Sequence, residues 1–296
     1  MLDHYIYGKV NRISPEAPVP IVEVHDEIDM LGGCGNVIIN LYNLGISIKI
    51  LSVIGKDKNG QTILSKLNDI KIKTGDIFSS NDFLTNYKMR IIANNQHVVR
   101  ADWDSSSLNQ EAEDFIYNSI DRLINNVDGV IVSDYFKGVC TEKIIQKTIT
   151  SLNNENKPVF VDPKGTNWDK YTGATFITPN IEEISSVIGE TPCSDDDFLA
   201  AGENIIKKYQ INNCLITRGA NGMTFVNKDD SFHIPAKTKE VYDVSGAGDT
   251  VIACLAAAII NGQSIQEAVE LSNNAASKVV THMGTSAITL NELEIT

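Results

Sequence analysis

The chain has 296 residues, of which 42% are hydrophobic and 21% are charged, and its net charge at pH 7 is −13. This composition predicts one large α/β domain, alone or with a small appendage, and the charge argues against nucleic acid or an anionic membrane as the main partner. The start lacks the layout of a signal peptide, no stretch reaches membrane-spanning length, and five cysteines without C-x-x-C spacing indicate free thiols in a reducing cytoplasm.

The first hundred residues predict a small antiparallel layer. Residues 20–24 alternate between apolar and polar side chains, and residues 87–92 and 96–101 are typical of a hairpin across Asn94-Asn95. We expect this layer to lie outside the main sheet, either as a lid over a cleft or as a contact between two copies of the chain.

From residue 128 onward, short β-branched runs alternate with amphipathic stretches. This alternation predicts a parallel sheet with helices on both faces. The predicted strands cover residues 129–133, 158–162, 174–178 and 214–217. The predicted helices cover residues 142–152, 195–209, 250–260 and 265–280, and a further helix begins at Ile181.

Polar residues follow four of these strands in succession. They are Ser133-Asp134, Asp162-Pro-Lys164, Thr178-Pro-Asn180 and Thr217-Arg218. Each of them alone could simply cap the next helix. Ligands of open α/β sheets bind beyond the carboxyl ends of the strands, so four such ends in succession favour a shared cleft.

The segment Asp243-x-x-Gly-Ala-Gly-Asp249 precedes an apolar helix. A glycine turn that opens a helix aims free backbone N–H groups and the positive end of the helix dipole at one point, which suits a phosphate. Asp249 would repel that phosphate, and its presence makes sense as a base that removes a proton from an attacking hydroxyl. The alternative is an ordinary helix start with an aspartate in its first turn.

These residues resemble the two signatures of the ribokinase-like (PfkB) carbohydrate kinases, Gly32-Gly-Cys-Gly-Asn36 near the start and Gly246-Ala-Gly-Asp249 near the end. Two further segments, Ser14-Pro-Glu-Ala-Pro-Val-Pro20 and Asp162-Pro-Lys-Gly165, resemble the heptose-7-phosphate kinase branch. The resemblance implies a ribokinase-like three-layer α/β fold with a mainly parallel central sheet and a small β lid. It implies a single kinase domain over residues 1–296, with lid segments at about 10–25 and 84–103.

The implied reaction is ATP-dependent phosphorylation of the C1 hydroxyl of D-glycero-β-D-manno-heptose 7-phosphate, on the way to ADP-heptose for lipopolysaccharide. By resemblance, Asp249 is the catalytic base, and Gly246, Ala247 and Gly248 form the anion hole. The positions that match the nucleotide-binding segments are Asn180, Glu183, Thr217, Arg218, Gly219 and Asn273. The positions that match the sugar-binding segments are Asp3, Gly32, Gly33 and Asn36.

The implied cofactors are ATP and Mg²⁺, the metal being carried by the nucleotide with Glu183 contacting it through water, and a monovalent cation is a further candidate. Lys137 and Lys164 would ordinarily be solvated surface charges. Beside strand ends in an acidic protein they become candidate ligands of the substrate phosphate. The expected partners are the sugar phosphate and ATP, with a homodimer formed through the lid as a further candidate.

The chain departs from the family pattern at its start. Members usually begin with an apolar strand ending in Gly-Asp just ahead of the position of Met1, and we expect that missing strand to belong in the main sheet. Two alternatives to the heptose kinase stay open: another sugar or sugar-phosphate kinase of the same superfamily, and a nucleotide- or sugar-binding protein without turnover. Retention of Asp249 favours an enzyme over the binding protein.

Overall fold

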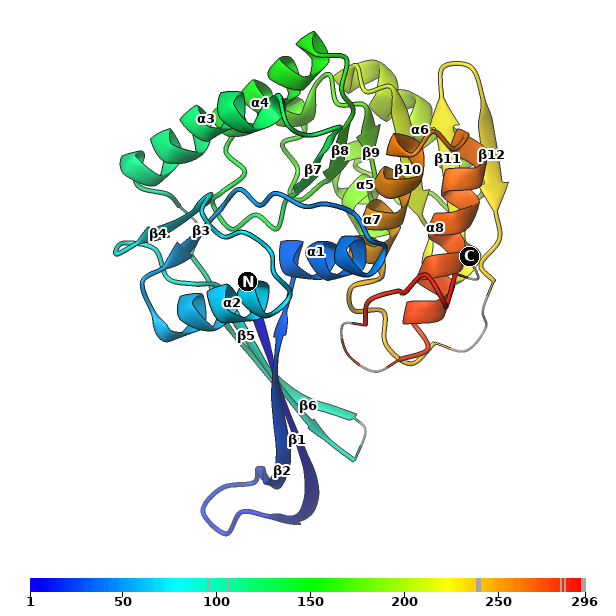
Figure 1. Cartoon of the computed structure of the whole chain (residues 1–296). Helices are drawn as coiled ribbons and strands as arrows, with labels where there is room; N and C mark the ends of the chain where they lie inside the picture. Colours follow the sequence, from blue (N-terminus) through cyan, green and yellow to red (C-terminus); the bar gives the residue numbers. More distant parts are fainter. Residues whose placement is uncertain (95, 106, 238–240, 283, 285, 294–296) are drawn as a thin grey trace.

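The computed structural model describes residues 1–94, 96–105, 107–237, 241–282, 284 and 286–293, so Asn95 of the predicted hairpin lies outside the described residues. The α-helices are α1 (Cys34–Asn43), α2 (Lys58–Asp69), α3 (Gln110–Ile124), α4 (Glu142–Asn154), α5 (Ile181–Ile188), α6 (Asp195–Tyr209), α7 (Ala247–Ile260) and α8 (Ile265–Val279). Figure 1 shows them packed as one body, from which a ribbon of long strands projects.

The largest sheet has six strands in the order β12-β11-β10-β9-β8-β7. They are β7 (Val130–Ser133), β8 (Val159–Asp162), β9 (Phe176–Ile177), β10 (Asn213–Thr217), β11 (Met223–Asn227) and β12 (Ser231–Ile234). Strands β7 to β10 are parallel, whereas β11 and β12 add to the edge in antiparallel fashion. The predicted parallel sheet is therefore confirmed, and its carboxyl ends meet along one edge.

Alternate side chains of this sheet enter two separate cores. Val159, Val161 and Ile216 pack with α4, α5 and α6 on one face. Phe160 and Leu215 pack with α7 and α8 on the other face. Because successive side chains of a strand point to opposite faces, apolar runs such as residues 159–161 must be covered on both sides. The result is three layers, helix on sheet on helix.

Side chains cap most of the helices that border the sheet. Asn180, Ser194 and Ser264 each form a reciprocal capping box with the residue three positions later. Helix α7 differs, because its N-cap is Gly246, which has no side chain and adopts a left-handed φ of 81°. The N–H of Ala247 donates to the carbonyl oxygen of Val244 at 3.2 Å. The first turn of α7 has no side-chain cap, so the N–H groups that follow Ala247 are the candidates for an anion-binding turn.

A second sheet of four strands has the order β2-β1-β5-β6. Its members are β1 (Leu2–Ile13), β2 (Pro20–Leu31), β5 (Tyr87–Ala93) and β6 (Gln96–Trp103). The body buries the start of β1, where Leu2 and Tyr5 have exposed fractions of 1% and 0%. The far ends of β1 and β2 project away from the body (Figure 1) and carry exposed apolar side chains, among them Ile13 and Val24.

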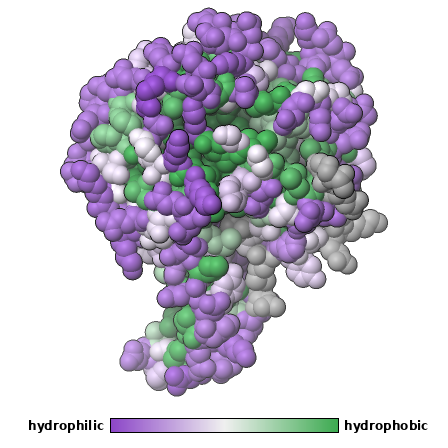
Figure 2. All heavy atoms as spheres, in the orientation of Figure 1, coloured by the Kyte–Doolittle hydropathy of each residue, from purple (hydrophilic) through white to green (hydrophobic). Residues whose placement is uncertain are grey.

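A two-stranded parallel sheet of β3 (Ser52–Gly55) and β4 (Ile77–Ser80) lies apart from the six-stranded sheet. A cavity of about 500 Å³ separates β3 from β7, and Met1 stands among its lining residues. Its walls are side chains of α1, α3, α4 and α7, most of them apolar. Hydrophobic side chains gather in a hollow of the body in Figure 2. Within the described residues, β3 pairs only with β4 and β7 only with β8.

The structure also bears on the predictions for membrane-spanning segments, for cysteines and for individual helices and strands. Among the residues that the structure describes, no helix is both long and apolar enough to span a membrane. All five cysteines are free, with Cys214 and Cys254 fully buried. The predicted helix 195–209 is confirmed with the same bounds, and the predicted hairpin strands correspond to β5 and β6.

We propose that the cavity between β3 and β7 is where the expected additional strand belongs. An apolar extension ending in Gly-Asp ahead of Met1 should raise the melting temperature by on the order of 5–10 °C, because each buried large side chain stabilises by about 1.5–3 kcal/mol. Sugar affinity should also rise, while ATP affinity stays the same. Melting curves and separate titrations, with a charged extension of equal length as control, measure this. Equal melting temperatures for both extensions would show that the strand is dispensable.

Candidate active site

The carboxylate of Asp249 lies at the centre of the site, in the first turn of α7, with an exposed fraction of 4%. Asn36 of α1 donates a hydrogen bond from Nδ2 to its Oδ2 at 3.0 Å. The phenol of Tyr135, just beyond the end of β7, donates to its Oδ1 at 2.6 Å. Three segments that are far apart in the sequence thus meet at one carboxylate.

Burial raises the pKa of Asp249 to about 6, against the lowering effect of the hydrogen bonds from Tyr135 and Asn36. The negative charge of Asp3 acts in the same direction as burial. A carboxylate with such a pKa is ionised at neutral pH and still accepts a proton readily, which suits a general base.

The glycine turn beside Asp249 is open. A Cβ built on Gly248 would meet nothing within 4 Å, and Gly248 is exposed. Gly246 is held by α1, since Asn36 also donates to its carbonyl oxygen at 3.4 Å. Gly246, Ala247 and Gly248 form the N-cap and the first two positions of α7, directly before Asp249. The anion hole expected at this turn stays a prediction.

The predicted sugar-binding residues come together next to Asp249. Asp3 of β1 is 2% exposed and accepts a hydrogen bond from Arg90 of β5 at 2.8 Å. A Cβ on Gly32 would lie 2.1 Å from Oδ2 of Asp3, so only glycine allows this close approach. Asn36, three residues after Gly33, already bonds Asp249. Carboxylate and amide groups at this place suit the hydroxyls of a polyol.

Three of the predicted nucleotide-binding residues lie together at the ends of β9 and β10, namely Asn180, Glu183 and Thr217. Asn180 and Glu183 form the capping box of α5, so the alternative role of Asn180 as a helix cap is present as well. Asn180 forms a parallel bridge with Thr217. Lys164 donates from Nζ to Oε1 of Glu183 at 2.7 Å. This places Lys164, a candidate ligand of the substrate phosphate, beside residues predicted to bind the nucleotide.

Three other predicted nucleotide contacts are placed differently. The guanidinium of Arg218 pairs with Asp195 of α6 and lies over the ring of Phe198. Gly219 is exposed with open space around its Cα. The buried Asn273 of α8 donates to the carbonyl oxygen of Pro235 at 2.9 Å.

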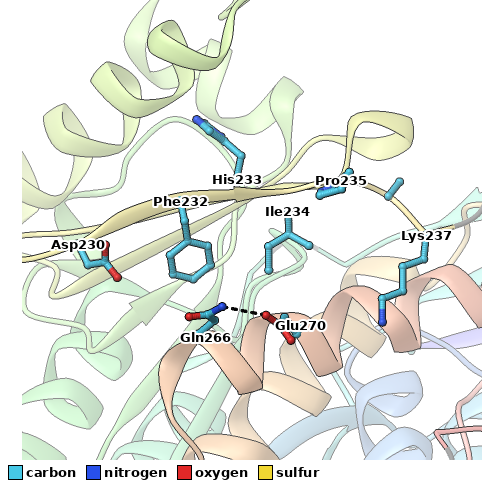
Figure 3. Close-up of a pocket in the computed structure, with 9 residues that line it drawn as sticks. Asp230, Phe232, His233, Ile234, Pro235, Lys237, Gln266 and Glu270 are labelled. Atoms are coloured by element: carbon cyan, nitrogen blue, oxygen red, sulfur yellow. Dashed lines mark hydrogen bonds between the residues drawn. The ribbon is translucent and has the colours of Figure 1, made fainter.

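Pro235 also lines a cavity of about 530 Å³ between β12 and α8. Figure 3 shows Phe232 and Ile234 directed toward α8, with His233 on the opposite side of the strand. Gln266 and Glu270, which face this cavity from α8, hydrogen-bond each other at 3.0 Å. Asn273 lies one turn beyond Glu270, which puts this predicted nucleotide-binding position next to the cavity.

The sequence matches the family described as pfkB family carbohydrate kinase over residues 4–292. This match spans nearly the whole chain. The chain belongs to the PfkB family of carbohydrate kinases. It is therefore a sugar kinase, which uses a nucleoside triphosphate such as ATP and typically a divalent cation, and the alternative of a binding protein without turnover is not supported.

Curated relatives share more sequence than the solved structures do. The chain is 40% identical over 294 residues to the "Bifunctional protein HldE" of Vibrio vulnificus strain CMCP6, covering 99% of this chain and 61% of the relative. The protein of the same name from Trichlorobacter lovleyi is 40% identical over 296 residues, covering 99% and 60%. The chain thus spans about three-fifths of the length of these relatives.

Two solved structures show the fold. Phosphofructokinase-2 from Escherichia coli in complex with potassium superposes with a TM-score of 0.82 at 18% identity, covering 99% of this chain and 94% of that chain. Ribokinase from Arabidopsis thaliana, complexed with ribose and ATP, gives a TM-score of 0.75 at 17% identity, covering 99% and 96%. The predicted ribokinase-like three-layer fold is confirmed.

Two residues of this kinase site had no role assigned from sequence. Tyr135 directly follows the polar strand end Ser133-Asp134, yet only the structure shows its bond to Asp249. Asp162, at the end of β8, has a pKa well above its usual range because it is buried and faces the charges of Asp249 and Glu183. The only sign of a role for Asp162 in the sequence is its position at the end of a predicted strand. The rise in its pKa depends on Glu183 of α5 and Asp249 of α7, which are distant in sequence.

Replacing Asp249 with Asn should reduce turnover by about 10²–10⁴-fold, because the amide keeps the shape but cannot accept a proton. ATP binding should stay within about twofold, since the backbone of the α7 turn is unchanged. Steady-state kinetics and nucleotide titration measure the two effects. Asp196→Asn, an exposed aspartate in the first turn of α6, is the matched control. Near-wild-type turnover of D249N would remove Asp249 from the mechanism.

Turnover should fall as the pH drops through about 6, because the base works only when ionised and burial raises the pKa of Asp249 to about 6. Activity is therefore full above this range and lost below it. Values of kcat/KM measured between about pH 5 and pH 8 give the midpoint. A profile that stays flat to pH 5 would contradict the assignment of Asp249 as the base.

Proposed function

We propose that this kinase transfers the γ-phosphoryl group of ATP to the C1 hydroxyl of D-glycero-β-D-manno-heptose 7-phosphate. The product is the 1,7-bisphosphate, a precursor of ADP-heptose for the lipopolysaccharide core. The observation that carries the chemistry is the buried Asp249 carboxylate, held beside the open glycine turn of α7 and next to Asp3 and Asn36. Asp3 and Asn36 are the side chains proposed to bind the polyol. The choice of heptose rests on the Ser14–Pro20 and Asp162–Gly165 motifs and on the relatives named HldE.

In the proposed reaction, the sugar hydroxyl donates a hydrogen bond to Asp249. The hydroxyl oxygen forms a bond to the γ-phosphorus as the bond to the bridging oxygen of ADP breaks, and the proton passes to Asp249. The amino end of α7 at Gly246, Ala247 and Gly248 stabilises the charge on the transferring group. Little covalent chemistry is required of the protein, so positioning accounts for most of the rate.

A substrate that carries its own phosphate fits a cluster of cations at the four-stranded sheet. Lys88 and Arg100 both pair with Asp102, at 3.8 and 3.0 Å. Lys137 pairs with Asp104, and the charge of Lys137 acts on Lys88. Lys88 is the register partner of Asp3, which is why this cluster adjoins the sugar side. In a protein of net charge −13, three cations here favour a sugar phosphate over a neutral sugar.

Mg²⁺ is the proposed divalent ion, and when bound it neutralises charge on the nucleotide phosphates. Glu183 is a carboxylate at the nucleotide side whose oxygens already accept from Lys164 and from the backbone of Asn180. A group so engaged suits contact with a hydrated Mg²⁺ through water better than direct coordination. A monovalent cation is a further candidate, since the E. coli phosphofructokinase-2 structure was obtained with potassium.

The four-stranded sheet is proposed as the lid of this site and as the contact of a homodimer. Its strand β1 carries Asp3 at the sugar side, so movement of the sheet would move a substrate ligand. Exposed apolar side chains on β1, β2 and β6 would be covered in a dimer; they include Ile13, Val24, Val99 and Trp103.

An ADP-release assay over a panel of sugar phosphates tests the proposed function. Heptose 7-phosphate should give the highest kcat/KM, and the dephosphorylated heptose should react at least about 10-fold less well because it lacks the group that Lys88, Arg100 and Lys137 would hold. Excess EDTA should abolish the reaction. Preference for fructose 6-phosphate or ribose would assign the chain to another sugar kinase of the family.

A further inference from the structure

Tyr135 touches two parts of the site that are separate in sequence. Its hydroxyl donates to Oδ1 of Asp249 at 2.6 Å. Its ring lies against the glycine turn that precedes α1, since a Cβ on Gly33 would come within 3.1 Å of Cε2 of Tyr135. A single side chain from the end of β7 therefore packs on the sugar turn and bonds the proposed base.

The turn that carries Tyr135 has an unusual backbone. Phe136 has a φ of 56°, which is uncommon for an aromatic residue, and its side chain is 66% exposed. Its N–H donates to Oδ1 of Asp134 at 2.7 Å. A strained conformation of this kind costs roughly 1–3 kcal/mol and persists only where the surroundings enforce it.

The surroundings here are a buried hydrogen-bond network. Asp134 is 3% exposed, and its Oδ2 accepts from Lys170 at 2.5 Å and from the phenol of Tyr171 at 2.7 Å. The ammonium group of Lys170 also lies 5.8 Å from the centre of the Phe136 ring. Lys170 and Tyr171 thus hold one oxygen of the Asp134 carboxylate, and the other oxygen holds the backbone N–H of Phe136. These bonds fix the turn and with it the orientation of the Tyr135 side chain.

We propose that Tyr135 is a positioning residue that holds the carboxylate of Asp249 in the orientation required for proton removal from the substrate hydroxyl. The proposal rests on the proposed role of Asp249. Tyr135 and Asn36 occupy one acceptor position on each carboxylate oxygen, which fixes the plane of the carboxylate and leaves its other lone pairs for the substrate. Burial and the charge of Asp249 raise the pKa of the phenol, so it stays a donor throughout the working pH range.

Replacing Tyr135 with Phe removes only the hydroxyl. We expect kcat to fall roughly 10-fold, as for the loss of one hydrogen bond to a charged group, with KM for ATP within about twofold. In the Asp249→Asn background the same replacement should cost less than about twofold, because no base remains to be oriented. A merely structural role would reduce turnover equally in both backgrounds, and that result would overturn the proposal.

The pH profile gives an independent readout. The phenol stabilises the ionised form of Asp249, so its removal raises the pKa of the carboxyl and should move the acid limb of kcat/KM to higher pH. An unmoved limb, with kcat unchanged, would also overturn the proposal. The other polar and titratable groups that act on or respond to Asp249 are Asn36 and Cys34 of α1, Asp3 of β1 and Asp162 of β8. All of them are unchanged in Tyr135→Phe.

Tyr117→Phe is the matched control, since Tyr117 lies on α3 against Lys143 and should leave kinetics and pH profile unchanged. Melting curves show whether Tyr135→Phe folds normally. Failure of the wild type on every sugar phosphate would reject the proposed function. The role of Tyr135 would then be read from the carboxyl titration of Asp249 by NMR with ¹³C-labelled aspartate, where an equal midpoint in wild type and Tyr135→Phe rejects it.

Discussion

The site depends on keeping one charged carboxylate out of water. An isolated buried carboxylate would be neutralised by a large rise in its pKa, because burial penalises the charged form. At Asp249 the rise stops at about 6, since Tyr135 and Asn36 both donate to the ionised group. The donors come from the end of β7 and from α1. Correct packing of α1 and α7 against the sheet is therefore a condition for having a base that is ionised at neutral pH.

The space around each backbone position explains why glycines occur at the turns before α1 and α7, next to Asp249. A side chain on Gly32 would overlap the carboxylate of Asp3, and one on Gly33 would press on Met1 and Tyr135 at a φ of 56°. Gly248 has the opposite surroundings, with nothing near the Cβ position. Gly32 and Gly33 allow other parts of the chain to pack closely against the turn, whereas Gly248 leaves open space at the proposed anion hole. The same residue type thus serves packing at one turn and access at the other.

Patterns within single segments of the sequence predicted most helices and strands of the three-layer body. They failed where an element or a role depends on contacts between segments that are distant in sequence. The helix at 195–209 was found with its bounds because capping and apolar spacing both lie within the segment. Strand β2 was predicted only at 20–24 and extends to Leu31, since residues 23–28 are largely exposed and show no alternation of burial. The motifs located Asp249 and Asn36. They could not reveal the role of Tyr135 or the raised pKa of Asp162, which depend on neighbours distant in sequence.

The lysines around the site differ in how far their ion pairs are buried. This difference affects how readily a phosphate can bind them in an acidic protein. Lys170 is 8% exposed and bonds the buried Asp134, so separating that pair would leave a charge unpaired in the core. Lys164 and Lys137, with exposures of 46% and 25%, pair with Glu183 and Asp104, whose side chains are 10% and 33% exposed. Ion pairs that water reaches are weaker than fully buried ones, so a phosphate can compete for these lysines more readily than for Lys170. The buried pair fixes the backbone beside Tyr135, and we propose that the two more exposed pairs hold Lys164 and Lys137 in place until an anionic substrate binds.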